Sequence, residues 1–500
     1  MPYTQQNRFI AITTPLGEDV LLLQEFSGEE AISRPFHYHL HVLSLQNSID
    51  FSQIIGQRVS IRITLYDGTP RYINGFVSRF AQGDVGPEFT HYEMDVVPWL
   101  WFLTRHADCR IFQNLTIPQI IEQVFKDRGF TDYRNNLTGT YATREYCVQY
   151  RESDFQFVSR LMEEYGIFYF FQQEEEKHTL VMADSPSACN ACPDQSEVGF
   201  NTAGGGLDKE DVVEAWDQAL ELRSGKYSIT DYNFETPSTN LFSSEPTVTS
   251  YANNTTLEIY DYPGKYRTKT DGAGLAKVRM QAEEVPVELA RGRSNCRAFA
   301  AGYTFSLLDF PVSSVNKSYL LTEVRHQASI GTGYTTGGSD ASYSNSFVCI
   351  ASDVPFRPPR VTPVPLIRGP QTAVVVGKDG EEIWVDQYGR VKVQFFWDRL
   401  GKKDENSSCW IRVSQVWAGK NWGAMWIPRI GQEVIVEFLE GDPDRPIITG
   451  RVYNAEQEVP YKLPDYGTRS TLLSRSSKNG DSANFNEIRF EDKKGCSAIA

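Results

Sequence analysis

Two cysteines near the middle of the chain have a spacing that suits redox or metal chemistry. Cys189 and Cys192 are separated by two residues, and such a pair can exchange a disulfide or supply half of a zinc site. A zinc site needs further ligands nearby, but the next cysteine is Cys296. A redox pair opens a helix, whereas Pro186 and Pro193 flank this one. The spacing therefore favours two reduced thiols in a loop.

Three histidines alternate along one segment. His37, His39 and His41 share one face of a predicted strand, opposite Phe36 and Tyr38, and imidazoles bind metals. Alternate side chains of a flat strand stand about 6.5–7 Å apart, farther than adjacent ligands of one ion. We therefore expect a polar, solvent-facing surface here, and the sequence predicts no metal site and no cofactor.

Sequence signatures of hydrolases are missing. Neither G-x-S-x-G nor H-E-x-x-H occurs in the 500 residues. Acidic residues outnumber basic ones by 64 to 49, for a net charge of −15, and no acidic pair stands out as catalytic. Such a charge also disfavours general binding to nucleic acid. The sequence thus predicts no catalytic residues and a protein that is not an enzyme.

Alternation with a period of two indicates strands in the first 110 residues. Residues 36–42 alternate, and residues 59–65 run through the turn-forming pair Asp67-Gly68 into residues 72–80. This pattern is typical of a β-barrel or sandwich. A run of apolar residues long enough to cross a membrane is absent, and the N-terminus has no signal-peptide pattern.

Two helices with start and stop residues follow. Thr116 and Gln119 can form a capping box before an apolar helical face that ends at Gly129. A second helix is predicted from Ser153 to Gly166, before a strand at 167–171. These elements predict an α/β insertion at residues 111–205.

The rest of the chain returns to strand signals. Residues 206–350 resemble a second barrel of similar size, with one helix near 272–285. Prolines crowd residues 351–370 and predict a stiff linker. Residues 371–455 hold five or six short strands, which suits an OB-type barrel. Their 11 basic and 12 acidic residues disfavour a third alternative, an OB barrel that binds single-stranded DNA.

Several tracts resemble one known family closely. In the OB region these are residues 388–399, 404–415, 417–423, 427–436 and 440–450. Upstream they are Arg34-Pro-Phe36, Arg151-Glu-Ser-Asp-Phe155 and the stretch from Glu163 to Tyr169. Together they resemble VgrG, the valine–glycine repeat spike proteins of bacterial type VI secretion systems. The resemblance covers nearly the whole chain.

The resemblance implies a mainly β multidomain (α+β) fold similar to a phage tail hub. Residues 1–110 and 206–350 would be two tube-like barrels, with the α/β insertion between them, and residues 371–455 an OB collar. Residues 456–500 would begin a β-helical needle. Only Cys496 to Ala500 follow the stretch 486–495, so we expect a truncated needle.

The resemblance also implies a function and partners. Three subunits would form a homotrimer whose six barrels face a hexameric tube protein on the baseplate, and the trimer would puncture a target membrane mechanically. A spike-tip protein and effectors would join if a needle is present. We expect assembly in the bacterial cytoplasm and secretion without a signal peptide. The main alternative is a cell-wall hydrolase associated with a phage-like tail.

A set of OB-region residues is expected to pack the barrel and contact other subunits of the trimer. They are Tyr388, Trp397, Asp398, Arg399, Trp410, Arg412 and Trp422. Large aromatic and arginine side chains are enriched in protein interfaces.

Overall fold

The chain folds into two compact units, each assembled from separated segments. A computed structural model describes residues 3–193, 195–202, 210–249, 251–331, 334, 341–496 and 498–499. The large unit comprises Met1–His106, Ile121–Ala142 and Phe155–Pro363. The small unit comprises Ala107–Ile120, Thr143–Asp154 and Val364–Ala500. The predicted mainly β fold class is confirmed.

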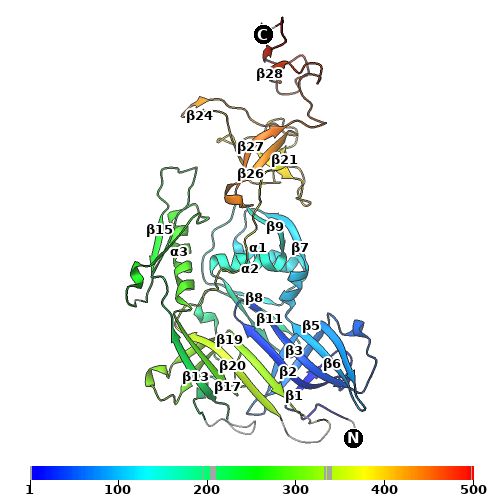
Figure 1. Ribbon diagram of the computed structural model, residues 1–500, viewed down its shortest axis with the longest axis vertical. Helices are drawn as coiled ribbons and strands as arrows, with labels where there is room; N and C mark the ends of the chain where they lie inside the picture. Colours follow the sequence, from blue (N-terminus) through cyan, green and yellow to red (C-terminus); the bar gives the residue numbers. More distant parts are fainter. Residues whose placement is uncertain are drawn as a thin grey trace. The chain divides into compact units, whose positions relative to one another are not determined.

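A twelve-stranded sheet forms the frame of the large unit. Its order is β1-β4-β5-β6-β3-β2-β19-β20-β17-β13, with β12 and β18 attached beside β19. The strands are β1 (Ile10–Thr13), β2 (Leu22–Ala31), β3 (Arg34–Ser44), β4 (Arg58–Thr64), β5 (Pro70–Val85), β6 (Thr90–Val97), β12 (Glu197–Gly199), β13 (Val213–Leu220), β17 (Glu288–Ser294), β18 (Thr304–Leu308), β19 (Ser318–Ser329) and β20 (Ser342–Ala351). Figure 1 shows the early strands in blue beside the late strands in green and yellow.

The two predicted barrels are therefore two halves of one sheet. Their seam is the antiparallel pairing of β2 with β19, in which Glu30 lies opposite Val324. Alternation buries Phe36, Tyr38 and Leu40 of β3 in the core. The predicted Asp67-Gly68 turn joins β4 and β5.

The described residues form three α-helices: α1 (Ile117–Asp127), α2 (Asp154–Tyr165) and α3 (Lys269–Glu284). The predicted capping box of α1 is present, because the Thr116 N–H donates to Gln119 Oε1 at 2.9 Å and the Gln119 N–H to Thr116 Oγ1 at 3.4 Å. Gly129 and Gly166 follow α1 and α2 with φ of 78° and 68°, the left-handed conformation that ends helices. Within the described residues, no helix has the length and apolar character to span a bilayer.

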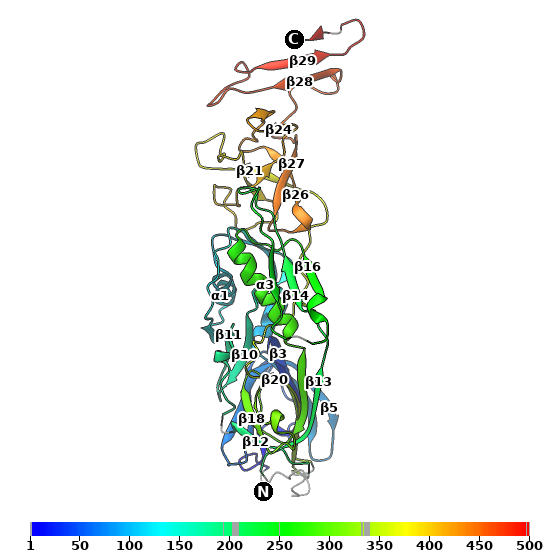
Figure 2. The same cartoon turned by 90° about the vertical axis from the view of Figure 1, so that its left-hand side faces the viewer.

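Two small sheets accompany the helices of the large unit. They are β10-β11-β8 and β15-β14-β16, with bounds β8 (Tyr133–Asn136), β10 (Phe168–Gln173), β11 (His178–Ala183), β14 (Lys226–Ile229), β15 (Ser243–Pro246) and β16 (Glu258–Asp261). Figure 1 shows α3 beside β15, and Figure 2 shows the helix next to β14 of the same sheet. Tyr227, Ile229, Leu275 and Met280 form a core between helix and sheet.

The small unit is built on a five-stranded sheet of order β22-β21-β26-β27-β23. The described strands of the whole small unit, in this sheet and in smaller ones, are β7 (Ala107–Phe112), β9 (Cys147–Ser153), β21 (Gln371–Val376), β22 (Lys392–Phe395), β23 (Arg412–Val413), β24 (Ala418–Gly419), β25 (Trp422–Gly423), β26 (Glu433–Phe438), β27 (Pro446–Val452), β28 (Arg469–Leu473), β29 (Glu487–Glu491) and β30 (Ala498–Ile499). Val391 and Ile411 bridge β22 toward β23. Strands β28, β29 and β30 form a separate antiparallel sheet, and its role as the start of a needle stays a prediction.

The proline-rich segment is held by hydrogen bonds within each unit. In the large unit, the Arg357 guanidinium donates to the Gly166 carbonyl at 2.8 Å and Thr362 Oγ1 donates to Glu163 at 2.6 Å. In the small unit, the Ile367 N–H donates to the Gly441 carbonyl at 2.8 Å. The predicted domain limits stay a prediction, and the division into two units runs through the predicted insertion at 111–205.

Candidate functional site

Two of the predicted OB residues pack the barrel from the end of β22. The Trp397 ring stacks on Phe395 with centroids 5.0 Å apart, and its Nε1–H donates to Gln371 Oε1 at 3.0 Å. Asp398 is 8% exposed. Its Oδ1 accepts from the backbone N–H groups that follow it, at 3.1 Å each. Both residues therefore hold the local structure of the barrel.

The third residue of this tract, Arg399, ties the barrel to a ribbon formed by β7 and β9. Its Nη2 donates to Asp108 Oδ2 at 2.6 Å. Burial alone would raise the pKa of Asp108, but hydrogen bonds from Arg399 and from the Cys109 N–H outweigh it and lower the pKa. These contacts thus favour the charged over the protonated form of Asp108 in the native small unit.

A second carboxylate fixes the ribbon from the barrel side. Asp444 Oδ1 accepts from the Val148 N–H at 2.7 Å, and its Oδ2 accepts from Arg144 at 3.0 Å. Tyr146 and Val148 belong to the same apolar core as the barrel strands. Sequence reasoning missed Asp108 and Asp444 because their partners lie about 300 positions away, although Asp444 falls within a tract that carries the family resemblance.

The remaining predicted residues lie nearer the surface. The Trp410 ring faces Trp384 at 6.3 Å, and Lys392 Nζ is 5.2 Å from its centroid. Tyr388 is 48% exposed, with the Arg390 guanidinium 5.2 Å from its ring centroid. Arg412 is exposed on β23. The structure thus separates the predicted set into packing residues and surface residues, and subunit contact stays a prediction.

Trp422 belongs to an exposed cluster, which we call the aromatic hairpin (residues 416–426). Strands β24 and β25 pair there, and the Trp417 and Trp422 rings meet edge to face at 5.1 Å. The exposed members are Val416, Trp417, Trp422, Met425 and Trp426, with Trp422 at 58%. Large apolar groups gathered on a surface mark interaction sites.

The two spaced cysteines are placed where thiol chemistry is suppressed. Cys189 follows a 3-10 turn and Cys192 lies in the apolar core with Phe305 and Phe347. Burial raises the pKa of both thiols to about 12, so the reactive thiolate is scarce at neutral pH. This agrees with the predicted reduced thiols.

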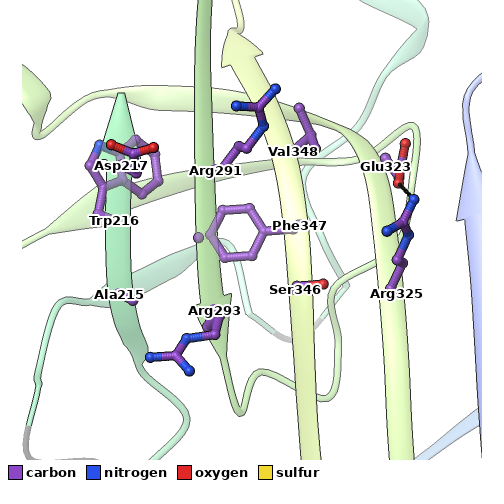
Figure 3. Close-up of a pocket in the computed structure, with 11 residues that line it drawn as sticks. Ala215, Trp216, Asp217, Arg291, Arg293, Glu323, Arg325, Ser346, Phe347 and Val348 are labelled. Carbon is purple, nitrogen blue, oxygen red and sulfur yellow. Dashed lines mark ion pairs between the residues drawn. The ribbon is translucent and has the colours of Figure 1, made fainter. Parts of the chain in front are cut away.

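A cavity of about 570 Å³ opens on the sheet of the large unit between β13, β17, β20 and β19. Figure 3 shows the Phe347 ring among the lining side chains, near Arg291 and Arg293 and on the side that faces the Glu323–Arg325 ion pair. Gly292 lies opposite Phe347, and any Cβ there would collide with the Phe347 ring. The lining combines three arginines with Trp216 and Phe347 and with the acidic residues Asp217 and Glu323.

Taken together, a broad two-part β hub unit and a small barrel unit define a tail-hub and injector class of protein. The family described as phage tail baseplate hub (GPD) matches residues 29–332. The type VI secretion system/phage-baseplate injector OB domain matches residues 371–453. The confirmed resemblance thus extends over both units.

The chain belongs to the VgrG family of type VI secretion system spike proteins. It is 47% identical over 501 residues to the type VI secretion system spike protein VgrG1b of Pseudomonas aeruginosa, covering all of this chain and 67% of that protein. It is 46% identical over 497 residues to VgrG1a of the same organism, covering 99% and 77%.

Other similarities bear on fold and on the question of enzymatic activity. The structure of the E. coli c3393 protein, a type VI component similar to bacteriophage T4 gp27 and gp5, aligns with a TM-score of 0.65 at 21% identity, covering 88% of this chain and 99% of that one. This likeness shows the fold. The actin cross-linking toxin VgrG1 of Vibrio cholerae is 34% identical over 491 residues, and the chain spans 96% of its own length but 44% of that protein.

Proposed function

We propose that the chain is the hub-and-spike component of a type VI secretion system and works as a machine part without catalytic turnover. The observation that carries this proposal is the aromatic hairpin, because five large apolar side chains, three of them tryptophans, are exposed together within residues 416–426. An exposed aromatic surface of this kind favours association with another protein surface, and in a closed ring of three identical subunits it would contact a different surface of the neighbouring subunit. The names of the first relatives, which are spike proteins, support the same role.

The proposed assembly is a homotrimer whose aromatic hairpins contact neighbouring subunits. Each large unit would contribute its two predicted barrels, and the six barrels of the trimer would face a hexameric tube protein on the baseplate. The spike would puncture the target membrane and help deliver effectors. The trimer would form in the bacterial cytoplasm before secretion. A solved complex that pairs a VgrG with PdpA in Francisella, which aligns with a TM-score of 0.59 at 9% identity, is consistent with a spike that takes further protein partners.

Native mass tests this proposal directly. Three copies of the 56.7 kDa chain make 170.1 kDa, and we expect light scattering after gel filtration to give that mass. The double variant Trp417→Ala/Trp422→Ala should give a monomer mass with unchanged circular dichroism. The matched control is Tyr232→Ala. Tyr232 is 50% exposed, close to the 58% of Trp422, but it lies in the large unit. The Tyr232→Ala variant should stay trimeric. A folded parent chain at 56.7 kDa, or a trimeric double variant, would contradict the proposed contact.

A further inference from the structure

Three side chains of the types that ligate metal ions lie close together on the polar face of the large sheet. They are His39 and His41 of β3 and Glu93 of β6, and one potential ligand atom from each lies within 4.8 Å of the others. The spacing argument from the sequence expected the imidazoles to stand apart. In the structure the His39 and His41 rings lean together, with centroids 5.0 Å apart and planes at 88°.

Strand register explains the convergence. Strands β3 and β6 are antiparallel neighbours, with His41 opposite Glu93 and His39 opposite Asp95. Directly opposite side chains in such a pair have Cβ atoms about 4.5–5.5 Å apart. Glu93 on β6 therefore places its carboxylate next to the two imidazoles on β3, and the pairing of these two strands is enough to bring the three side chains together.

A carboxylate behind the cluster orients one imidazole. Asp95 Oδ1 lies 2.7 Å from His39 Nδ1, and the Asp95 side chain is only 17% exposed. This hydrogen bond places the ring proton on Nδ1 and leaves Nε2 with a lone pair. Histidines that bind metals commonly have such a carboxylate partner on the other ring nitrogen, which fixes the tautomer and raises ligand basicity.

We propose that His39, His41 and Glu93 form a binding site for a zinc ion, with Asp95 as the positioning residue for His39. Two imidazole nitrogens and one carboxylate oxygen match the ligand types of zinc, and water would take the fourth position of a tetrahedron. The side chains are part-exposed, so an ion can enter from solvent. The proposal is independent of the spike function.

The charged neighbours set the strength of the site. Glu25 Oε1 lies 3.6 Å from His41 Nε2 and adds negative charge. The Arg79 guanidinium lies 3.2 Å from Glu93 Oε2 and competes with a cation. His37 Nε2 is 3.7 Å from Asp95 Oδ1 on the far side of the positioning carboxylate. Arg79 is 53% exposed, so its side chain can move away when an ion binds.

Calorimetric titration of the full chain with zinc chloride tests the proposal. The background carries Cys496→Ser, because the exposed Cys496 thiol could bind zinc independently. We expect one zinc per chain. The variants His41→Ala and Glu93→Gln should each weaken binding at least about tenfold. The matched control is His91→Ala, an exposed histidine on the same strand as Glu93, which should leave the affinity unchanged.

Two further variants separate a metal site from a fortuitous cluster. Asp95→Asn should weaken zinc binding by roughly 10–100-fold although Asp95 is not a ligand. Arg79→Gln should strengthen binding, because it removes the competing cation. The proposal is overturned if the parent chain takes up no stoichiometric zinc, or if His41→Ala binds zinc as tightly as the parent. Circular dichroism of each variant checks that the fold is retained.

Discussion

The two units differ in where they place their largest aromatic side chains. The largest side chains with almost no exposure all lie in the large unit, and they are Trp99, Tyr38, Tyr92, Tyr169, Tyr319, Phe36, Phe125, Phe157, Phe168, Phe170, Phe299 and Phe305. The small unit holds six of the nine tryptophans, yet Trp417, Trp422 and Trp426 are exposed. The large unit thus buries the largest of the fully covered aromatic side chains, whereas half of the tryptophans of the small unit are exposed in the aromatic hairpin.

Each unit also contains buried charged groups that join segments distant in sequence. Across the seam of the large sheet, His326 lies between Glu30 at 2.8 Å and the Tyr343 hydroxyl at 2.7 Å, and Arg71 reaches Glu30 at 3.1 Å. These groups belong to β2, β5, β19 and β20, so one network joins both halves of the sheet. In the small unit, the corresponding charged contacts join the ribbon to the barrel. Polar groups thus specify how segments distant in sequence come together.

The largest expected effect is loss of a buried aromatic from the large unit. Trp99 is 1% exposed, stacks on Phe130 at 4.8 Å and donates to the Asp132 carbonyl at 3.1 Å. We expect Trp99→Ala to lower the free energy of unfolding by about 3–5 kcal/mol. Hydrogen exchange should quicken in peptides of the large unit. Equal quickening in peptides from residues 371–453 would contradict the division into two units.

The next largest effect concerns the ribbon of the small unit. Asp444→Ala removes one acceptor of the Val148 N–H and one carboxylate partner of Arg144, whose side chain is 14% exposed. Because a buried ion pair loses one partner, we expect a loss of about 3 kcal/mol, with faster exchange in β7, β9 and β27. The control is Asp465→Ala, since the Asp465 side chain is 59% exposed and its loss should change stability by less than about 0.5 kcal/mol. Equal effects of the two variants would show that the ribbon is not anchored by Asp444.

A smaller effect depends on pH and lies in the large unit. His178 Nε2 accepts from the Trp99 N–H at 2.9 Å, and its Nδ1 lies 3.0 Å from Asn74 Oδ1. Burial, with a lesser contribution from the Arg58 charge, lowers the pKa of His178 from 6.5 to about 3. Between pH 6.5 and 3, His178 therefore binds a proton in the unfolded chain but stays neutral in the native chain. The neutral, buried His178 thus contributes fully to the free energy of unfolding above pH 6.5, and this contribution is lost as pH falls toward 3.

Removing the titrating group should remove that slope. Between pH 6 and 4, the free energy of unfolding of the parent should fall more steeply than that of His178→Gln, by up to about 1.4 kcal/mol per pH unit. Above pH 7 the difference between the two proteins should not depend on pH. Parallel curves throughout denaturant titrations from pH 4 to 8 would show that His178 protonates in the native state.

The smallest expected effect on the stability of a single chain is in the aromatic hairpin. Trp422 is 58% exposed and makes an edge contact with Trp417, so Trp422→Ala should change the free energy of unfolding of the separated chain by less than about 0.5 kcal/mol. Its effect should appear in assembly instead. A loss comparable to that of Trp99→Ala would mean that this tryptophan completes the small unit's own core, and the contrast between the units would fail.

The sequence by itself determined the local elements and the family. Helix α1 and its capping box, the turn at Asp67-Gly68 and the alternating strand β3 depend on neighbouring residues, which is why short-range patterns predict them. The OB tracts predicted the barrel and the family, and both are confirmed.

Only the tertiary structure decided which distant segments meet. The ribbon of β7 and β9 shares the barrel core, although about 220 residues separate it from β21, because an apolar surface can be covered by any segment that reaches it. The convergence of His39, His41 and Glu93 depends on the register of β3 with β6. The difference between buried and exposed tryptophans has the same origin, since residue type predicts a tendency to be buried and three-dimensional packing decides which side chains are covered.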